Sequence, residues 1–251
     1  MRSAVIITAR LSSSRLPRKI LADIGGHTVL ELLVRRLRLA SLPEIMVLTT
    51  TTEKEDDELA AAASELGVTV FRGETRDILE RWRGAAIAND LDLLVTCDGD
   101  DMFCDPVHVD KVIDTHRRTG AEYITCTGLP FGAAPTGIAR TGLERVCARK
   151  QDTETEGQGR FFAVPGIVTR AEVAAPKMLE HPTCRMTLDY PEDLAFFQTV
   201  LSVLGPDPCP SLARIVALLR ERPDIVEINR GRQHEYWRRF HARYGPVELK
   251  A

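Results

Sequence analysis

Short apolar runs alternate with segments of helical periodicity through the first half of the chain. The runs with the length and composition of buried strands cover residues 5–8, 44–49, 68–71, 91–96 and 123–127. Apolar side chains repeat at helical spacing in residues 29–39, 56–66, 78–89 and 107–119. This alternation is typical of parallel strands joined by crossover helices. The pattern therefore predicts an α/β fold, a mostly parallel sheet flanked by helices.

The pattern is less regular in the second half of the chain. Residues 130–146 predict a loop, a short strand and then a helix. Residues 151–160 are polar and contain glycine, which predicts a mobile loop or lid. Residues 184–201 predict a strand, a turn and a helix that begins near Pro191.

The tail begins with a predicted helix and ends in a basic, aromatic segment, residues 232–245. An aromatic and basic stripe can stack on nucleic-acid bases. At helical spacing, however, such a stripe more often packs on its own domain or on a partner subunit, and we favour packing. Because no linker composition is found, residues 211–251 are expected to be a helical extension of the domain formed by residues 1–210.

Charge and composition exclude several classes of function. The chain has 251 residues, with 33 Lys and Arg against 36 Asp and Glu and a net charge of -3, which argues against a general nucleic-acid or membrane-surface role. There is no apolar run long enough for a membrane helix and no signal-peptide pattern. The six cysteines form no C-x-x-C pair, so we expect neither zinc nor a disulfide framework, and a reduced cytoplasmic protein.

The loop after the first strand concentrates positive charge. Arg10, Arg15, Arg18 and Lys19 lie within ten residues, together with a row of three serines. Cations and backbone amides after the first strand of a parallel sheet can hold phosphate groups. The loop lacks the spacing of a P-loop or of a dinucleotide-binding motif. A phosphate site and an ordinary solvated loop therefore both remain open.

A second candidate site follows the strand that ends near residue 96. Asp98 and Asp100 fall on the same side of an extended chain, where they can share one hard cation such as Mg²⁺. The alternative is an acidic turn whose carboxylates cap local backbone, and Asp105 is expected to be such a cap. For Asp98 and Asp100 we favour the metal site.

A third acid, Asp189, precedes the helix that begins near Pro191. Asp189 is equally compatible with an N-cap and with a ligand that completes the metal site with Asp100. Glu192 and Asp193 suit the positive end of that helix, so we expect them to stabilise the helix start.

Four segments, in the same order, resemble the CMP-sugar synthetases, above all the spore-coat polysaccharide type and the 3-deoxy-manno-octulosonate cytidylyltransferases. The first contains R-L-P-R-K and a glycine pair before a helix, and the segments cover residues 7–37, 47–82, 97–106 and 188–194. The likeness extends to about Leu204 and does not cover the chain after Ser211.

The resemblance implies a Rossmann-like nucleotidyltransferase fold of the glycosyltransferase-A type, with CTP as substrate and Mg²⁺ as cofactor. It implies that Arg10, Arg15 and Lys19 hold the triphosphate together with Ala9 and Ser14. It also implies that Asp100 and Asp189 bind Mg²⁺, with Asp98 assisting the metal and the nucleotide. Lys19, Arg15 and Asp100 would then be the catalytic residues.

The resemblance also assigns the nucleobase side. It implies that Thr49, Thr50, Arg72 and Gly73 surround the base, and Asp77 matches a family acid near the nucleotide whose role is open. Two positions depart from the family pattern. Many relatives have glycine where this chain has Arg18, and many have a proline after the Gly-Asp of the acidic turn, where this chain continues Asp101-Met102.

The resemblance places the acceptor on the second half of the chain. It implies acceptor contacts from Gly132, Thr136 and Gly137, and the loop residues Gln158 and Arg160 suit a small anionic acceptor. The alternative for Gln158 and Arg160 is ordinary solvation. A sugar acid, a phosphate or a phosphonate would serve as acceptor, and relatives are commonly homodimers.

Two other functions fit parts of this pattern. A glycosyltransferase shares the fold and the D-x-D at Asp98 and Asp100, but it does not need the R-L-P-R-K loop. A non-catalytic sugar-nucleotide-binding module does not need Asp100, Asp189 and Lys19 together. We therefore favour a CTP-dependent cytidylyltransferase.

Overall fold

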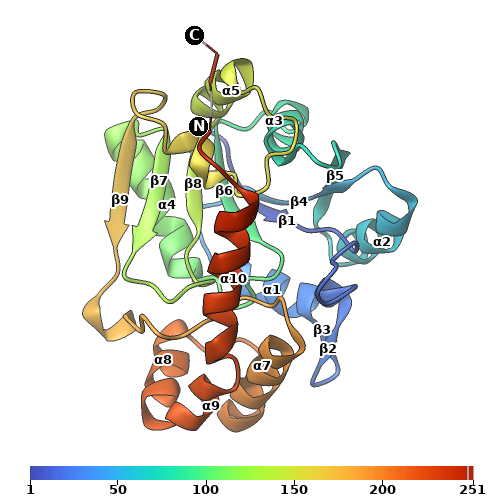
Figure 1. The fold of residues 1–251 in the computed structure, drawn as a ribbon, viewed down its shortest axis with the longest axis vertical. Coiled ribbons are helices and arrows are strands. Elements are labelled where there is room, and N and C mark those ends of the chain that lie inside the picture. Colours follow the sequence, from blue (N-terminus) through green and yellow to red (C-terminus); the bar gives the residue numbers. More distant parts are fainter. Residues whose placement is uncertain (248, 251) are drawn as a thin grey trace.

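The computed structural model describes residues 1–247 and 249–250, and its central feature is a seven-stranded sheet (Figure 1). The strands of this sheet are β1 (Ser3–Thr8), β4 (Ile45–Thr51), β5 (Thr69–Gly73), β6 (Leu93–Asp98), β7 (Tyr123–Thr127), β8 (Thr136–Ala139) and β9 (Arg170–Ala174). Their order is β5-β4-β1-β6-β8-β7-β9, and β8 is antiparallel to both of its neighbours while the other pairs are parallel. Two short strands, β2 (Asp23–Ile24) and β3 (His27–Thr28), form a separate antiparallel pair.

Helices cover both faces of the sheet. They are α1 (Val29–Leu37), α2 (Asp57–Glu65), α3 (Ile78–Ala88), α4 (Pro106–Thr119), α5 (Arg140–Arg149), α6 (Gly159–Phe162), α7 (Pro191–Leu204), α8 (Leu212–Glu221), α9 (Pro223–Glu227) and α10 (Arg230–Arg243). The predicted α/β fold with a mostly parallel, helix-flanked sheet is therefore confirmed.

The two faces of the sheet belong to two apolar cores. Successive side chains of a strand point to opposite faces, so Val5 and Ile7 of β1 join one core while Ala4 and Ile6 join the other. The first core contains residues from α1, α2, α4, α7 and α8, and the second contains residues from α3, α5 and α6. Burial on both faces explains why the central strands are almost continuously apolar.

The structure corrects two strand predictions. β9 was not predicted, because its five residues bury only Val173 and carry too weak an apolar pattern. The strand predicted at residues 184–188 does not form. This segment is buried. Among the described residues its β-pairing is limited to one isolated bridge, between Arg185 and Phe131. Its apolar character reflects burial and not pairing in the sheet.

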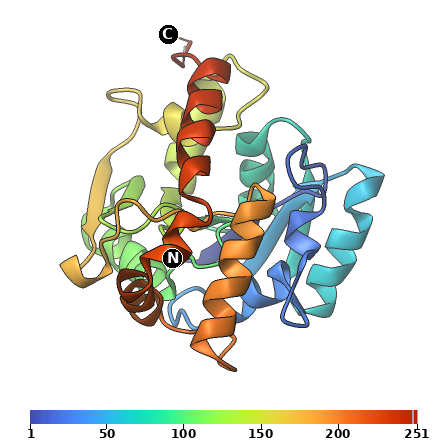
Figure 2. The ribbon, with the colours of Figure 1, turned by 60° about the horizontal axis from the view of Figure 1, so that its bottom comes forward.

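The tail divides into a packed part and an exposed part. α8 buries Leu212, Ile215, Val216 and Leu219 in the first core, at helical spacing. α10 buries none of its residues and runs back from the end of the molecule where α7, α8 and α9 gather (Figures 1 and 2). Across residues 1–247 and 249–250, the helices are all too short or too polar to cross a membrane.

One loop residue between β7 and β8 gives a test of this packing. Gly132 has a φ of 87°, and a Cβ at this position would lie 2.3 Å from the backbone oxygen of Met186. Gly132→Ala is therefore expected to lower the free energy of unfolding by about 2 kcal/mol or more, because a left-handed backbone alone costs about 1–3 kcal/mol for a residue with a side chain. Urea denaturation followed by circular dichroism measures this change.

Gly231→Ala is the matched control, because an added Cβ in α10 meets no heavy atom within 4 Å and alanine favours a helix. This variant is expected to be as stable as the unaltered protein or more stable. Equal losses in the two variants would contradict the close approach at Gly132.

Candidate active site

The basic loop, residues 9–19, and the acidic turn, residues 98–101, meet at one edge of the sheet. β1 and β6 are parallel neighbours, and their last residues, Thr8 and Asp98, pair with each other. The N–H of Gly99 donates to the Thr8 carbonyl at 2.8 Å. A Cβ on Gly99 would lie 2.7 Å from the Cβ of Ala9, so this glycine allows the two loops to approach closely.

A cavity of about 500 Å³, the large cavity, lies between these two loops. Each basic-loop residue that was predicted to contact the nucleotide lines it: Ala9, Arg10, Ser14, Arg15 and Lys19. The predicted metal ligands line the same cavity: Asp98, Asp100 and Asp189. The fold therefore brings together the basic and acidic segments that the sequence places far apart.

Lys19 joins the two most distant acids of this group. Its Nζ donates to Asp100 at 2.5 Å and to Asp189 at 2.9 Å. Burial disfavours the charged form of Lys19, but the two carboxylates outweigh this effect, and its pKa is raised. Asp189 shows the reciprocal effect, because Lys19 and Arg15 outweigh burial and lower its pKa. The Lys19 ammonium and the Asp189 carboxylate are thus held ionised.

The acidic turn has the oxygen arrangement of a cation site. One carboxylate oxygen from each of Asp98, Asp100 and Asp101 lies within 4.8 Å of the others. The pKa of Asp98 is raised to about 7, first because the carboxyl is buried and then because the negative charge of Asp100 is close to it. Carboxylate oxygens are the ligands that Mg²⁺ prefers, and these residues fit that ion. Asp101 was not among the predicted ligands.

Asp189 is not the N-cap of α7, a position that belongs to Tyr190. Besides Lys19 and Arg15, it accepts a hydrogen bond at 2.8 Å from the buried guanidinium of Arg185. Three cations therefore surround one carboxylate. Lys19 pairs with both Asp189 and Asp100 and so connects them. Asp189 itself is not part of the group of three close carboxylates formed by residues 98, 100 and 101.

Arg185 is held by a second acid that the sequence assigned only to the helix start. Asp193 accepts from the Arg185 Nε at 2.9 Å and from the backbone N–H groups of Asp189 and Tyr190 at 2.8 and 3.0 Å. Asn229, just before α10, donates to Asp193 at 2.9 Å. A buried polar network thus ties Asp189 to the root of the last helix.

Arg18 adopts an unusual backbone conformation. Its φ is 59°, in the left-handed region that favours glycine. Its side chain pairs with the exposed Glu58 at 2.6 Å and does not line the large cavity. The extra cation in the loop therefore belongs to the surface.

The residues predicted to surround the nucleobase do not line the large cavity. Thr49 and Thr50 are fully buried inside β4, and Arg72 donates to the carbonyls of Thr51 and Glu53. Gly73 lies against Phe71 and the stem of Arg81. These side chains are used in packing β4, β5 and the loop that follows β4.

Asp77 also lies outside the large cavity. It caps α3 by accepting from the Glu80 N–H at 3.1 Å, pairs with Lys150 and accepts from the Thr155 hydroxyl at 3.0 Å. Thr155 belongs to the segment that was predicted to be a mobile loop. Asp77 therefore anchors this segment, which the structure continues into the short helix α6.

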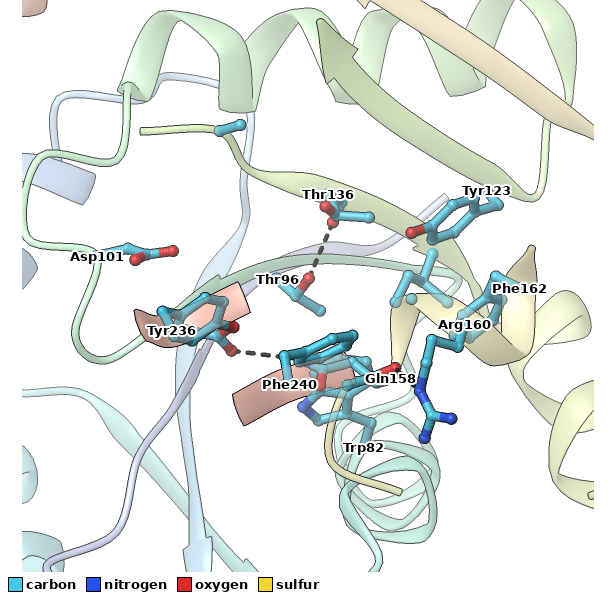
Figure 3. A pocket seen from close by; sticks show the side chains of 15 residues that line it. Trp82, Thr96, Asp101, Tyr123, Thr136, Gln158, Arg160, Phe162, Tyr236 and Phe240 are labelled. Carbon is cyan, nitrogen blue, oxygen red and sulfur yellow. Dashed lines mark hydrogen bonds between the residues drawn. The ribbon is translucent and has the colours of Figure 1, made fainter. Parts of the chain in front are cut away.

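A second cavity of about 350 Å³, the side cavity, contains several predicted acceptor residues (Figure 3). Thr136, Gln158 and Arg160 line it, and Gly132 and Gln158 line the large cavity. Gly137 lies inside β8, where an added Cβ would meet Val112 of α4 at 2.5 Å, so it lines neither cavity. Its absence of a side chain serves helix packing.

Arg81 is a lining residue of the large cavity that we did not predict. It is 2% exposed, and no carboxylate of the described residues forms a salt bridge with it. Burial, and then the charge of Arg10, lower its pKa to about 10. One feature of the sequence could have indicated this role: Arg81 is a cation that shares the apolar face of α3 with Ile78 and Trp82.

The last helix was also missed as part of the site. Tyr236, Arg239, Phe240 and Arg243 share one face of α10 and line the large cavity, and Tyr236 and Phe240 line the side cavity as well. The signal was their i, i+3, i+4, i+7 spacing. Periodicity identified the face but not the surface that it covers.

Several known proteins are similar to this chain. A family model described as "Cytidylyltransferase" matches residues 4–153. The chain is 28% identical over 229 residues to the spore coat polysaccharide biosynthesis protein SpsF of Bacillus subtilis, covering 88% of this chain and 95% of the relative. It is 31% identical over 182 residues to a 3-deoxy-manno-octulosonate cytidylyltransferase of Chlorobium limicola, covering 72% of this chain and 71% of the relative.

A solved structure has the same fold. A cytidylyltransferase from Leptospira borgpetersenii superimposes with a TM-score of 0.83 at 24% identity, covering 90% of this chain and 97% of that chain.

The network behind Asp189 leads to a stability prediction. Asp193→Ala is expected to lower the free energy of unfolding by about 3–5 kcal/mol, because it leaves the buried Arg185 guanidinium with one carboxylate instead of two. Urea denaturation measures the loss. Glu192→Ala is the control, because the adjacent Glu192 pairs with Arg232 at the surface and its removal is expected to change stability little. Similar losses in both variants would contradict the role given to the network.

Proposed function

The chain belongs to the cytidylyltransferase family, and on this premise we propose that it transfers CMP from CTP to an oxygen atom of a small acceptor, with release of pyrophosphate. Membership of this family makes the protein a nucleotidyltransferase enzyme. CTP is the substrate consistent with the family, and the proteins that this chain resembles include a CMP:2-keto-3-deoxy-manno-octonic acid synthetase.

The observation that carries the proposal is the meeting of the basic loop with Asp100 and Asp189 in one cavity. Arg10, Arg15 and Lys19 line the large cavity next to these acids. A triphosphate carries several negative charges, and charged donors held in advance at the cavity wall favour its binding. The acids would repel a triphosphate without a cation, so the two sets of charges suit a nucleotide that arrives with a metal ion.

We propose that Asp98, Asp100 and Asp101 hold Mg²⁺, with Asp189 close by through Lys19. The ion would neutralise phosphate charge and polarise the α-phosphate for attack. Asp189 has a second task in this proposal. It holds Arg15 and Lys19 at the cavity wall before the nucleotide binds.

The residues of the basic loop supply electrostatic stabilisation in the proposed reaction. The acceptor oxygen forms a bond to the α-phosphorus, and the bond from that phosphorus to the oxygen bridging the α- and β-phosphates breaks. Pyrophosphate leaves with the bonding electron pair. Lys19 and Arg15 stabilise the charge that grows on this leaving group, while the cavity walls hold the two reactants in line.

The base and the acceptor are assigned to opposite ends of the cavities. Arg81, Ile78 and Ala9 line the large cavity, and we propose that Arg81 donates to an oxygen of the base or ribose, since this buried cation has no carboxylate partner among the described residues. The acceptor enters through the side cavity. The acceptor class implied by the family resemblance is a sugar acid, a phosphate or a phosphonate. A homodimer remains a prediction.

The comparisons give no support to the glycosyltransferase alternative. That activity would use a nucleotide sugar as donor and would not release pyrophosphate from CTP. Release of pyrophosphate therefore separates the two functions in one measurement.

The nucleotide screen is the direct test of the function. Pyrophosphate release is measured with each of CTP, UTP, ATP and GTP in the presence of Mg²⁺ and a panel of candidate acceptors. CTP is expected to be strongly preferred, because the family uses this nucleotide. Equal release with all four nucleotides, or consumption of a nucleotide sugar without CTP, would contradict the proposal. Omission of Mg²⁺ with excess chelator is expected to stop release.

Lys19 gives a sharper test of the basic loop. Lys19→Ala is expected to lower kcat/KM for CTP by about 10²–10³-fold, the usual effect of removing one donor that stabilises developing charge. Arg18→Gly is the control from the same loop, because it removes an exposed cation and its left-handed backbone favours glycine. This variant is expected to keep its turnover. Full turnover in Lys19→Ala would contradict the role of the loop.

A further inference from the structure

The side cavity continues the large cavity past the acidic turn. Asp98, Asp101 and Gln158 line both cavities. A molecule in the side cavity therefore lies next to the acids of the proposed metal site, on the route by which an acceptor oxygen reaches the α-phosphate. What the side cavity recognises then bears on the chemical class of the acceptor.

Aromatic side chains form much of the side cavity. Trp82, Tyr123, Phe162, Tyr236 and Phe240 line it and come from four separate elements, α3, β7, α6 and α10 (Figure 3). Tyr123 and Phe162 stack on each other with ring centres 4.9 Å apart, so their orientation is held. Flat aromatic faces suit a ligand that presents C–H groups on a ring.

Hydroxyl and amide groups lie among these rings. Thr136 and Tyr123 line only the side cavity, and Figure 3 shows the Tyr123 hydroxyl on the side of Thr136. Gln158 donates to Asp98 at 3.5 Å, a long contact that leaves its amide available to a ligand. Neutral donors and acceptors of this kind bind hydroxyl groups.

The charges of the side cavity disfavour a negatively charged ring. Asp98 and Asp101 line it, and Arg160 is the one cation that does so among the described residues. The Arg160 guanidinium donates to the carbonyls of Gly245 at 2.6 Å and of Gly157 and Glu156 at 3.3 Å. Three of its five N–H groups are thus used by backbone carbonyls. A carboxylate in this cavity would face two acids and one cation, most of whose N–H groups are already used by backbone carbonyls.

α10 covers both cavities while being held mainly at its margins. Arg232 pairs with Glu192 at 2.5 Å near one end, and Arg243 pairs with Glu154 and Glu156 near the other. Phe131 packs against Tyr236 and Trp237 with ring centres 5.4 and 5.5 Å away. Although the helix buries none of its residues, the face with Tyr236 and Phe240 closes the cavities.

From these features, and on the premise of the proposed function, we propose that the side cavity binds the uncharged, hydroxylated ring of a sugar acceptor and that α10 forms its roof. This differs from the sugar acid that the family resemblance implies, because the ring itself carries no carboxylate. Two sources present the same ring. A free sugar attacks the α-phosphorus through a hydroxyl oxygen, whose proton passes to water. A sugar phosphate attacks through a phosphate oxygen, with the phosphate in the large cavity among its cations. In both cases pyrophosphate leaves.

Matched pairs of sugars test the charge requirement. Pyrophosphate release from CTP and Mg²⁺ is measured with glucose, galactose and mannose, with their uronic acids, and with the 1-phosphates of both sets. Each pair differs in one ring carboxylate. The neutral ring is expected to be used at least about tenfold faster, a difference of about 1.4 kcal/mol. The free and phosphorylated arms show which source supplies the acceptor oxygen.

Either of two results overturns the inference. One is faster release with a uronic acid than with its neutral parent, and the other is no release from any neutral ring by a protein that binds CTP. CTP binding is measured separately by calorimetry with Mg²⁺. A protein that binds no CTP would contradict the proposed function itself, so the two failures are distinguishable.

Substitutions in the side cavity test the assignment of residues. Tyr123→Phe and Thr136→Val each remove one hydroxyl from a residue that lines only this cavity. Each is expected to raise KM for the sugar about three- to tenfold, the effect of one lost hydrogen bond, with KM for CTP unchanged. Unchanged KM for the sugar in both variants would contradict the assignment.

The roof is tested on α10 itself. Tyr236→Leu is expected to raise KM for the sugar, whereas Trp237→Leu is not, because the neighbouring Trp237 lines neither cavity. Equal effects would show that the aromatic residues of α10 act only by holding the helix in place, which would overturn its role as the roof.

Discussion

The site depends on one buried arrangement of charge, in which the Lys19 ammonium lies between the carboxylates of Asp100 and Asp189. These residues come from the loop after β1, the turn after β6 and the segment before α7. An unpaired charge in a partly buried place is costly, so each segment holds the other two at the large cavity. The proposed reaction uses the same charges, because a polyphosphate and a divalent cation can exchange partners with them.

This arrangement extends from the sheet to the tail. Arg185 binds both Asp189 and Asp193, and Asn229 binds Asp193 directly before α10 begins. The orientation of the last helix is thereby coupled to the acids of the site. The family model ends at residue 153, so the basic loop and acidic turn lie inside the shared region, while α10 lies outside it. In the proposed function, the shared region handles the nucleotide and the tail contributes to acceptor choice.

Much of the fold was predictable, and so was the meeting of the basic loop with the acidic turn. The basic loop and the acidic turn follow apolar strands, and the ends of parallel strands meet at one edge of a sheet. The residues expected around the nucleobase do not line the large cavity. Thr49, Thr50 and Arg72 follow a motif in sequence, but their side chains are used in packing and in binding backbone carbonyls. Arg81 is the opposite case, because it lines the large cavity but was not predicted to do so. In the sequence it is only a cation on the apolar face of a helix.

The sequence by itself determined most elements of the α/β fold and the two charged segments that follow its strands, because hydrophobic periodicity is a local property. Only the tertiary structure decided what those charges contact and what the tail covers. The aromatic stripe of α10 and the buried segment 184–188 have the apolar patterns of ordinary packing surfaces. Their partners lie far away in the chain, as Phe131 does from Tyr236, and long-range contacts of this kind depend on the shape of the whole molecule.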